Sequence, residues 1–200
     1  MRLRDGLLFA LTLTAATLVG RDSRASLSFT VVFDALLEES TAAAVATTMD
    51  EHSAWEDGRI VTYTHARVDD VLAGGVGKDV WIRTLGGEVD DIGQQVEGEA
   101  TFTIGHRYLV FLKPNAENTM SVVARAQGEF PLVTADARTL RVLSTLRAVA
   151  LPPRADVVAR VQSRAPEAGQ PAIFVLAGKS VEDTRTLVKG AWSRTHASNR

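Results

Sequence analysis

Side chains alternate in character from Arg59 to Leu72, and this alternation is the feature that most constrains the fold. Successive residues of a β-strand point to opposite faces of a sheet, so the pattern predicts a long strand with two different faces. Asp79 to Leu85 alternates in the same way after the glycine-rich loop Gly74 to Gly77, and is predicted to be the next strand. One face of the long strand carries Ile60, Thr62, Thr64, Ala66 and Val68, and the other carries Val61, Tyr63, His65 and Arg67.

Further short apolar segments lie between turn signals. Arg107 to Lys113 is apolar at its centre and is bounded by Gly105 and Pro114, which is typical of a central strand buried on both faces. Asp50 to Gly58 is polar and ends in the turn dipeptide Asp57-Gly58, so it is interpreted as a turn. The other predicted strands are Thr41 to Thr48, Met120 to Gln127, Phe130 to Val133 and the short apolar run Ala172 to Leu176.

Helices are predicted at both ends of the strand-rich part. Phe33 to Glu39 has its apolar residues at helical spacing. Arg154 to Arg164 is amphipathic and follows two prolines, which suits the start of a helix. Ser180 and Asp183 form a capping box that opens a further helix, expected to end near Trp192.

Many short strands, the turn signals between them and the helices at each end predict a mostly β protein. The expected architecture is a small antiparallel, OB-like β-barrel with a short N-terminal helix and a helical C-terminal extension. Residues 26–150 are assigned to the barrel domain, and residues 151–200 to an α-rich extension packed on it with a frayed polar tail from residue 193. Residues 139–146 fit a strand or a helix, and the sequence leaves this alternative open.

The first 25 residues have the pattern of a secretory signal peptide. Arg2 and Arg4 precede the apolar stretch Leu7 to Val19, and small residues at Ser23 and Ala25 fit a signal peptidase site. Cleavage is expected between Ala25 and Ser26, which predicts a secreted or periplasmic protein without stable membrane insertion after cleavage. The alternative is a membrane anchor, but the apolar stretch is shorter than the roughly 20 residues that a spanning helix needs.

The composition excludes several classes of protein. The chain has 200 residues and no cysteine, so disulfide scaffolds, thiolate zinc sites and thiol nucleophiles are excluded. The formal net charge is −2, and removal of residues 1–25, with four arginines and two aspartates, changes it to −4. An acidic chain disfavours anionic partners, so no nucleic acid is expected to bind.

No glycine or histidine pattern matches a cofactor or metal motif. Gly77-Lys78 lacks both the first glycine and the hydroxyl residue of a phosphate loop, and a dinucleotide fingerprint that starts at Gly75 lacks its third glycine, because position 80 is Val80. The three histidines of the part expected to fold, which excludes the tail from residue 193, are far apart and lack metal-ligand spacing. We therefore predict no cofactor and no bound metal. These histidines are His52, His65 and His106.

Catalytic motifs are also missing from the sequence. No serine lies in a G-x-S-x-G elbow. Asp69-Asp70 and Asp90-Asp91 are adjacent pairs, and adjacent strand residues point to opposite faces, so neither pair makes a two-carboxylate site by itself. No catalytic residue is predicted. The alternative is a hydrolase in which these carboxylates meet His65 or His106 in one cleft.

Two residues of the polar segment 50–58 are candidates for binding a partner, namely His52 and Trp55. An exposed tryptophan at a hairpin tip can anchor a partner. In the alternative, Trp55 folds back over one end of the barrel, which the usual burial of tryptophan favours.

The run from Phe33 to Phe130 resembles a family of secreted bacterial β-barrel proteins of unknown role. The resemblance rests on FDALLEES (33–40), RIVTYTHARVDDVLAG (59–74), VWIRTLGG (80–87), VEGEATFTIGHRYLVFLKP (96–114) and ARAQGEF (124–130). More remotely, the chain is similar to the netrin/tissue-inhibitor-of-metalloproteinase module, an OB-type barrel with a similar G-x-x-Y-L-x-F strand. Inhibitors of that type chelate zinc through an N-terminal cysteine, whereas this chain has Ser26 at the expected N-terminus. The resemblance therefore implies a fold, and no functional residue is transferred.

These observations favour an exported, non-enzymatic β-barrel module that binds an extracytoplasmic protein or polymer. The export signal, the strand-rich pattern and the failure of every catalytic motif support this hypothesis. One alternative is an exported hydrolase with a carboxylate and histidine site outside the known motifs. Another is a module that inhibits proteases sterically through the segment around Trp55.

Overall fold

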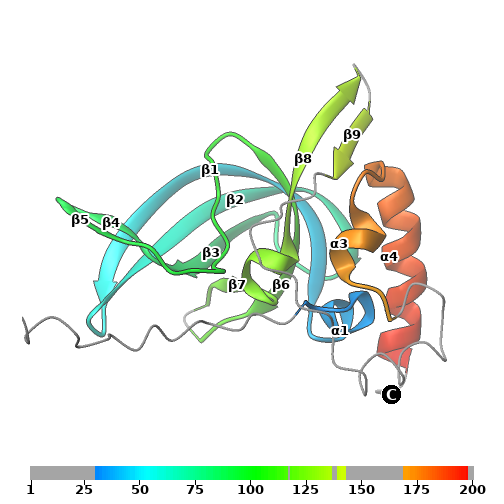
Figure 1. The fold of residues 1–200 in the computed structure, drawn as a ribbon, viewed down its shortest axis with the longest axis horizontal. Coiled ribbons are helices and arrows are strands. Elements are labelled where there is room, and N and C mark those ends of the chain that lie inside the picture. Colours follow the sequence, from blue (N-terminus) through cyan, green and yellow to red (C-terminus); the bar gives the residue numbers. More distant parts are fainter. Residues whose placement is uncertain (1–29, 117, 137–138, 143–168, 198–200) are drawn as a thin grey trace, which may run out of the picture.

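The computed structural model describes residues 30–116, 118–136, 139–142 and 169–197. It is mostly β, with a seven-stranded mixed sheet, a separate two-stranded hairpin and helices near both ends of the described chain (Figure 1). The strands are β1 (Ala42–Glu56), β2 (Arg59–Gly74), β3 (Asp79–Leu85), β4 (Gly87–Val89), β5 (Ile92–Gln94), β6 (Arg107–Pro114), β7 (Met120–Val122), β8 (Glu129–Asp136) and β9 (Thr139–Val142). The helices are α1 (Phe33–Glu38), the 3-10 turn η1 (Arg125–Gly128), α3 (Ala172–Leu176) and α4 (Val181–His196).

Strands β1 and β2 form one long antiparallel hairpin. The turn is Asp57-Gly58, as predicted, and both residues have positive φ angles, of 47° and 76°. The interpretation of Asp50 to Gly58 as a turn is wrong, because β1 continues to Glu56 and its residues pair with β2 up to the turn. Both faces of this strand end carry polar residues, so its sequence does not differ from that of a loop.

The sheet curls until five of its strands close a ring. The strand order is β1-β2-β3-β7-β6, and β1 also pairs with β6. The contact between β3 and β7 is parallel, through Ile82 and Met120, so the sheet is mixed and not purely antiparallel as expected. Strands β8 and β9 continue the sheet beyond β6.

Two hydrophobic cores lie on opposite sides of the ring strands. Strand β6 shows this best, because Val110 and Leu112 belong to the core inside the ring, whereas Leu109 and Phe111 belong to the core between the ring and the helices. All four side chains are at most 1% exposed. The prediction of a central strand buried on both faces is confirmed.

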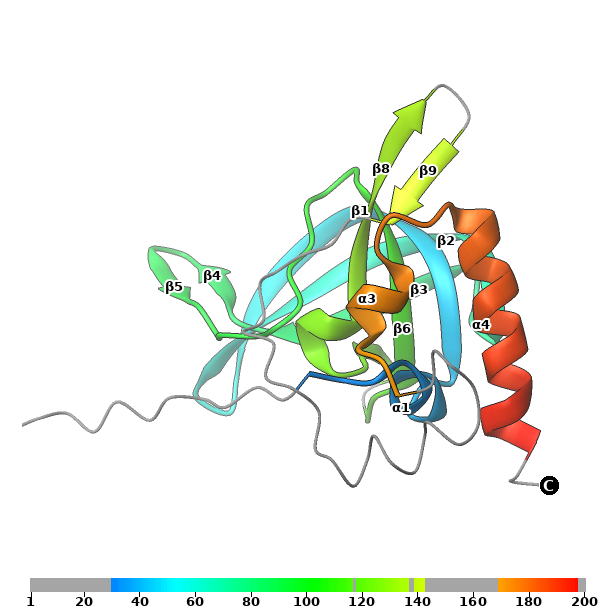
Figure 2. The ribbon, with the colours of Figure 1, turned by 45° about the vertical axis from the view of Figure 1, so that its right-hand side comes forward.

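The helices pack on one side of the sheet, and the β4–β5 hairpin projects at the opposite end (Figures 1 and 2). Ser180 caps α4 as predicted, because its Oγ accepts a hydrogen bond from the backbone N–H of Asp183 (3.1 Å). The helix continues to His196, four residues past the expected end at Trp192. Within the described residues, no helix is long and apolar enough to cross a membrane.

Two predicted strands are corrected by the structure. Ala172–Leu176 is helix α3, and the burial of Ala172, Val175 and Leu176 follows helical spacing that a five-residue apolar run does not reveal. Strand β7 ends at Val122, because Ala124 and the residue after it have φ angles of 55° and turn the chain into η1.

Other predictions concern residues at the margins of the described chain. Thr139–Val142 is a strand, so the first half of the segment 139–146, which the sequence left open as strand or helix, is a strand. The remaining part of that segment lies outside the described residues, as do the cleavage site at Ala25 and Ser26 and the helix expected at 154–164.

Candidate functional site

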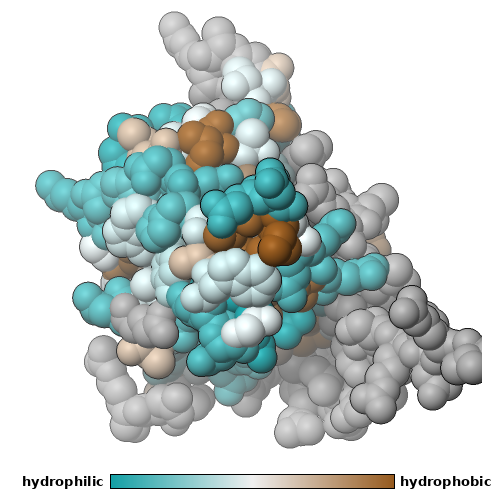
Figure 3. All heavy atoms as spheres, turned by 90° about the vertical axis from the view of Figure 1, so that its left-hand side faces the viewer, coloured by the Kyte–Doolittle hydropathy of each residue, from teal (hydrophilic) through white to brown (hydrophobic). Residues whose placement is uncertain are grey.

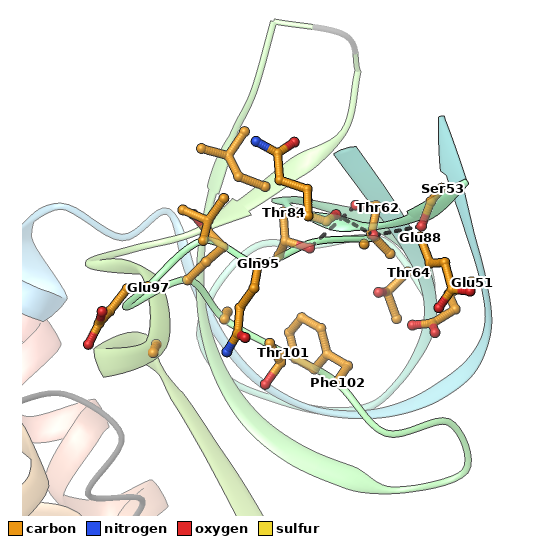
Figure 4. Close-up of a pocket in the computed structure, with 18 of the residues that line it drawn as sticks. Glu51, Ser53, Thr62, Thr64, Thr84, Glu88, Gln95, Glu97, Thr101 and Phe102 are labelled. Carbon is orange, nitrogen blue, oxygen red and sulfur yellow. Dashed lines mark hydrogen bonds between the residues drawn. The ribbon is translucent and has the colours of Figure 1, made fainter. Parts of the chain in front are cut away.

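A pocket of about 1150 Å³ opens inside the ring, beside the β4–β5 hairpin. Strands β1, β2 and β3 supply one wall, the hairpin and the residues after it supply another, and the segment 98–102 closes a third side (Figure 4). The inner core fills the rest of the ring with apolar side chains. The pocket is thus the part of the ring interior that the chain leaves open to solvent.

Hydroxyl groups line the wall formed by the strands. Ser53 and Thr62 are hydrogen-bonded across β1 and β2 (2.8 Å), and Thr62 also donates to the Gly86 carbonyl (2.7 Å). Thr64, two residues further along β2, is only 1% exposed and points into the pocket (Figure 4). Its hydroxyl has no hydrogen-bond partner among the described residues, whereas that of Thr84 contacts the Thr62 carbonyl at 3.4 Å. Thr64 is therefore a buried polar group that faces the open space.

The hairpin wall is held in place by two glycines. Gly87 has a φ angle of 133°, and a Cβ atom there would overlap the Thr62 hydroxyl and lie 2.5 Å from that of Ser53. Gly86 has a φ angle of 92°, and a Cβ atom there would lie 2.7 Å from the Gln94 carbonyl. The Gln94 side chain in turn accepts a hydrogen bond from the backbone N–H of Ile60 (2.6 Å). Only glycine permits this close approach of the hairpin to β1 and β2.

Four carboxylates make the pocket acidic: Glu51, Glu88, Glu97 and Glu99. Burial raises the pKa of the Glu99 carboxyl, and the Arg125 guanidinium at 3.7 Å opposes this effect. The other three carboxylates are exposed and have no ion-pair partner among the described residues. None of the described lining residues is a lysine or an arginine. Among the described residues, the negative charge of Glu51, Glu88 and Glu97 is therefore uncompensated.

Phe102 gives the pocket its aromatic contact surface (Figure 4). Its ring packs edge-to-face on Tyr108 of β6, with centroids 5.1 Å apart. The Tyr108 hydroxyl accepts a hydrogen bond from the Thr103 backbone N–H (2.8 Å), which fixes the segment that carries Phe102. The face of the molecule at the hairpin end is mainly hydrophilic, with hydrophobic residues in small separate patches (Figure 3).

The two predicted binding residues, His52 and Trp55, lie on strand β1 and not in a turn. Trp55 pairs with Ile60 next to the hairpin turn and is 50% exposed, so it does not fold back over the ring. His52 is exposed and stacks on Tyr63 of β2, with ring centroids 5.3 Å apart. The structure therefore separates the two residues onto opposite faces of the hairpin.

His52 belongs to an aromatic cluster on the outer face of β1, β2 and β3, which consists of His52, Tyr63, His65 and Trp81. His52 stacks on Tyr63, His65 stacks on Trp81 with ring centroids 4.9 Å apart, and His52 meets Trp81 edge-to-face, so each ring is already in contact with another ring of the cluster. Asp50 and Asp79 lie 3.0 and 3.5 Å from the two ring nitrogens of His65. Because its members pair among themselves, the cluster is a weaker candidate for a ligand than the pocket.

The carboxylates considered for a hydrolase do not meet in one cleft within the described residues. Asp69 pairs with Arg107 (3.2 Å) and also with Arg67, and Asp70 pairs with Arg185 of α4. Asp90 and Asp91 form the exposed β4–β5 turn. No three His, Cys, Asp or Glu side chains of the described part group closely enough to hold a metal ion.

The pocket residues were missed because they come from segments distant in sequence. The sequence does point to part of the pocket wall, because Thr62 and Thr64 lie on the same predicted strand face as Ile60 and Ala66. Hydroxyls on an otherwise apolar strand face indicate a position where that face meets water. The contributions of the hairpin and of Phe102 have no such local signal.

The interpretation of the pocket rests on its own geometry, since no protein-family model, no curated protein sequence and no solved structure matches the chain.

Proposed function

We propose that the chain is an exported, non-enzymatic binding module, and that its interior pocket takes up part of an extracytoplasmic protein or polymer. The single observation that carries this proposal is the open pocket, which is lined by Thr64, a residue whose hydroxyl has no hydrogen-bond partner among the described residues. Small β-barrels are usually filled by side chains, and ligand sites are typically concave spaces of several hundred Å³. An open pocket of about 1150 Å³ in this position is of the size that a ligand segment needs.

The strand order supports an OB-type barrel as the scaffold. With β6 and β7 counted as the fourth and fifth strands, the ring runs 1-2-3-5-4 and returns to strand 1. This order agrees with a five-stranded Greek-key barrel of the OB type, in which the face of the middle strands binds ligands. The pocket wall formed by β1, β2 and β3 belongs to these middle strands but lies on the inside of the ring. The remote similarity to the netrin module points to the same scaffold.

Titration of the ¹⁵N-labelled protein with neutral, acidic and basic peptides and oligosaccharides tests the proposed function. We expect at least one ligand to shift the amide signals of Thr64, Thr84 and Gly87 in a saturable way. Glu88→Trp, which places a bulky side chain at the exposed rim, should abolish these shifts, and Glu38→Trp on α1 is the matched control. Shifts confined to the aromatic cluster, or binding unaffected by Glu88→Trp, would contradict the proposal.

Export is tested separately by intact-mass analysis of membranes, periplasm and medium. A soluble species that begins at Ser26 supports the expected cleavage after Ala25. A full-length species retained in the membrane fraction contradicts it, and assigns residues 7–19 to an anchor instead.

The exposure of Trp55 favours one second candidate, a steric inhibitor of proteases. The side chain is half exposed beside the turn of the β1–β2 hairpin, where it is free to contact a partner. If this function is correct, Trp55→Ala should abolish inhibition of secreted proteases. Ile92→Ala, which removes an equally exposed apolar side chain from β5, should leave it intact. Equal inhibition by both variants would discard this candidate.

A further inference from the structure

Building on the proposed binding function, we infer that the pocket selects a primary ammonium group on an alkyl chain, supplied by a lysine side chain of a partner protein. The argument depends on where the hydrogen-bond acceptors lie, on the charge of the pocket and on the apolar surface beside it.

The acceptors meet at the junction of β1 and β2. Glu51 is the direct antiparallel partner of Thr64, and both side chains lie on the inner face of the ring. Directly opposed residues of an antiparallel pair have Cβ atoms about 5 Å apart. No hydrogen bond joins these two side chains, so a donor placed between them can reach both the carboxylate and the hydroxyl. The Thr64 hydroxyl has no hydrogen-bond partner among the described residues, so it is available to such a donor.

A second carboxylate approaches from the hairpin. Glu88 follows Gly87, whose close contact with Ser53 and Thr62 fixes the start of β4 against the wall. In Figure 4 the carboxylates of Glu51 and Glu88 lie at the same end of the pocket. An ammonium group has three donors and no acceptor, which suits two carboxylates and one hydroxyl.

The charge of the pocket favours a cation over an anionic or neutral ligand. Arg125 compensates Glu99, but neither Glu51 nor Glu88 has an ion-pair partner among the described residues. No lysine or arginine of the described chain lines the pocket to receive a phosphate or a carboxylate. A bound anion would therefore face repulsion without any compensating contact.

Phe102 explains why the cation should have an alkyl chain. Its side chain lies in the middle of the pocket, between the strand wall and the segment that follows the hairpin (Figure 4). A lysine stem is apolar along its length and can pack on this ring while its ammonium group reaches the carboxylates. The pocket exceeds the volume of one side chain, which favours a peptide segment over a free amine.

The test compares three probes by NMR titration of the purified protein. Pentalysine should shift the amide signals of Thr64, Gly87 and Ala100, and pentalysine acetylated at every Nζ should bind at least about tenfold more weakly. Spermidine carries the same ammonium chemistry without a peptide backbone, and should bind more weakly than pentalysine. Equal binding of spermidine would overturn the assignment to a protein segment. Equal binding of the acetylated peptide would overturn selection of a cation.

Variants locate the effect within the pocket. Glu51→Gln and Thr64→Val, which preserve side-chain shape, should each weaken pentalysine binding by about fivefold. The matched control is Glu97→Gln, because the Glu97 carboxylate points away from the other labelled side chains (Figure 4). Weakening by the control alone, or by none of the three, would contradict the inference. If a neutral ligand binds the pocket but pentalysine does not, the inference fails and the proposed binding function stands; if no ligand binds there, both fail.

Discussion

The Glu56 carboxylate connects the end of the β1–β2 hairpin to strand β3 through hydrogen bonds to its charged form. Its carboxylate accepts hydrogen bonds from the Tyr63 hydroxyl and from the Arg83 guanidinium, which lies at 2.6 Å. These two hydrogen bonds, that of Tyr63 first, lower the pKa of the Glu56 carboxyl below its ordinary value. The same carboxylate raises the pKa of Arg83. The network therefore favours the folded state only while Glu56 is charged.

The first prediction concerns Glu56→Gln and the dependence of stability on pH. Because the pKa of Glu56 is lower in the folded than in the unfolded chain, its contribution is complete above the ordinary carboxyl pKa. That contribution is lost as the pH falls through the folded-state pKa. At about pH 7 the variant should be less stable by about 0.5 to 1 kcal/mol, a modest value because the site is partly exposed to solvent. Urea unfolding of both proteins between about pH 7 and pH 3 measures this.

The control for this prediction is Glu38→Gln, an exposed carboxylate of α1. It should change stability by less than about 0.5 kcal/mol throughout the same pH range. A Glu56→Gln effect that stays constant down to the lowest pH would show that shape, and not charge, holds the network.

The β4–β5 hairpin is an element whose position depends on close contacts that only glycine allows, above all at Gly87. Its two strands pair only with each other and not with the seven-stranded sheet. The hairpin is held against that sheet by the close packing of Gly87 on Ser53 and Thr62. Hydrogen bonds from the Gly86 N–H to the Ile60 carbonyl and from the Ile60 N–H to Gln94 complete the attachment. The position of this wall of the pocket therefore depends on the packing of Gly87 and on these hydrogen bonds.

The second prediction is that Gly87→Ala destabilises the protein by about 2 to 3 kcal/mol. The new Cβ atom overlaps the Thr62 hydroxyl and the φ angle of 133° is strained for any residue with a side chain. Gly93→Ala is the matched control in β5, because a Cβ atom there meets no atom within 4 Å. Thermal unfolding of the two variants tests the prediction, and equal melting temperatures would refute the role assigned to Gly87.

Elements with a regular pattern could be predicted from the sequence, and elements set by distant contacts could not. Side-chain alternation predicted β2 and β3, including which residues share a face, and the register of Thr64 with Ile82 agrees with it. Ser180 fixed the start of α4 through local chemistry. By contrast, α3 and the end of β7 depend on packing against other segments. Periodicity in a five-residue run is too short to show this.

The candidate site was predicted less well than the fold. Its strand wall could have been found from the hydroxyls of Thr62 and Thr64 on an apolar face. Glu88 reaches the pocket through the contact of Gly87 with β1 and β2, and Phe102 through its packing on Tyr108 of β6. Trp55 and His52 are close in sequence and were both predicted to bind a partner, yet as residues three positions apart in strand β1 they lie on opposite faces. Proximity in sequence is a poor guide in a strand for this reason.

At the scale of the whole molecule, two cores share the same strands. Strand β1 contributes Ala43 and Val45 to the core under the helices and Ala46 to the core inside the ring. Strand β6 divides its side chains in the same way. Asp70 of β2 also pairs with Arg185 of α4, which ties the helix layer to the ring. Because the two cores lie on opposite faces of the same strands, loss of one core would also destabilise the strands that form the other.

The third prediction is that the described fold unfolds in a single cooperative transition. Val110→Ala removes volume inside the ring and Val188→Ala removes it under α4, where both valines are fully buried. Each substitution should destabilise the protein by about 2 kcal/mol. Because the cores share β1 and β6, circular dichroism at helix wavelengths and tryptophan fluorescence should report the same midpoint for both variants. If the helices instead formed an independent layer, Val188→Ala would shift the helical signal to a lower denaturant concentration than the fluorescence of Trp55 on β1 and Trp81 on β3, measured in a Trp192→Phe background that removes the tryptophan of α4. Separate midpoints would therefore disprove the coupling, and equal shifts would show that the pocket's strands and the helix layer form one cooperative unit.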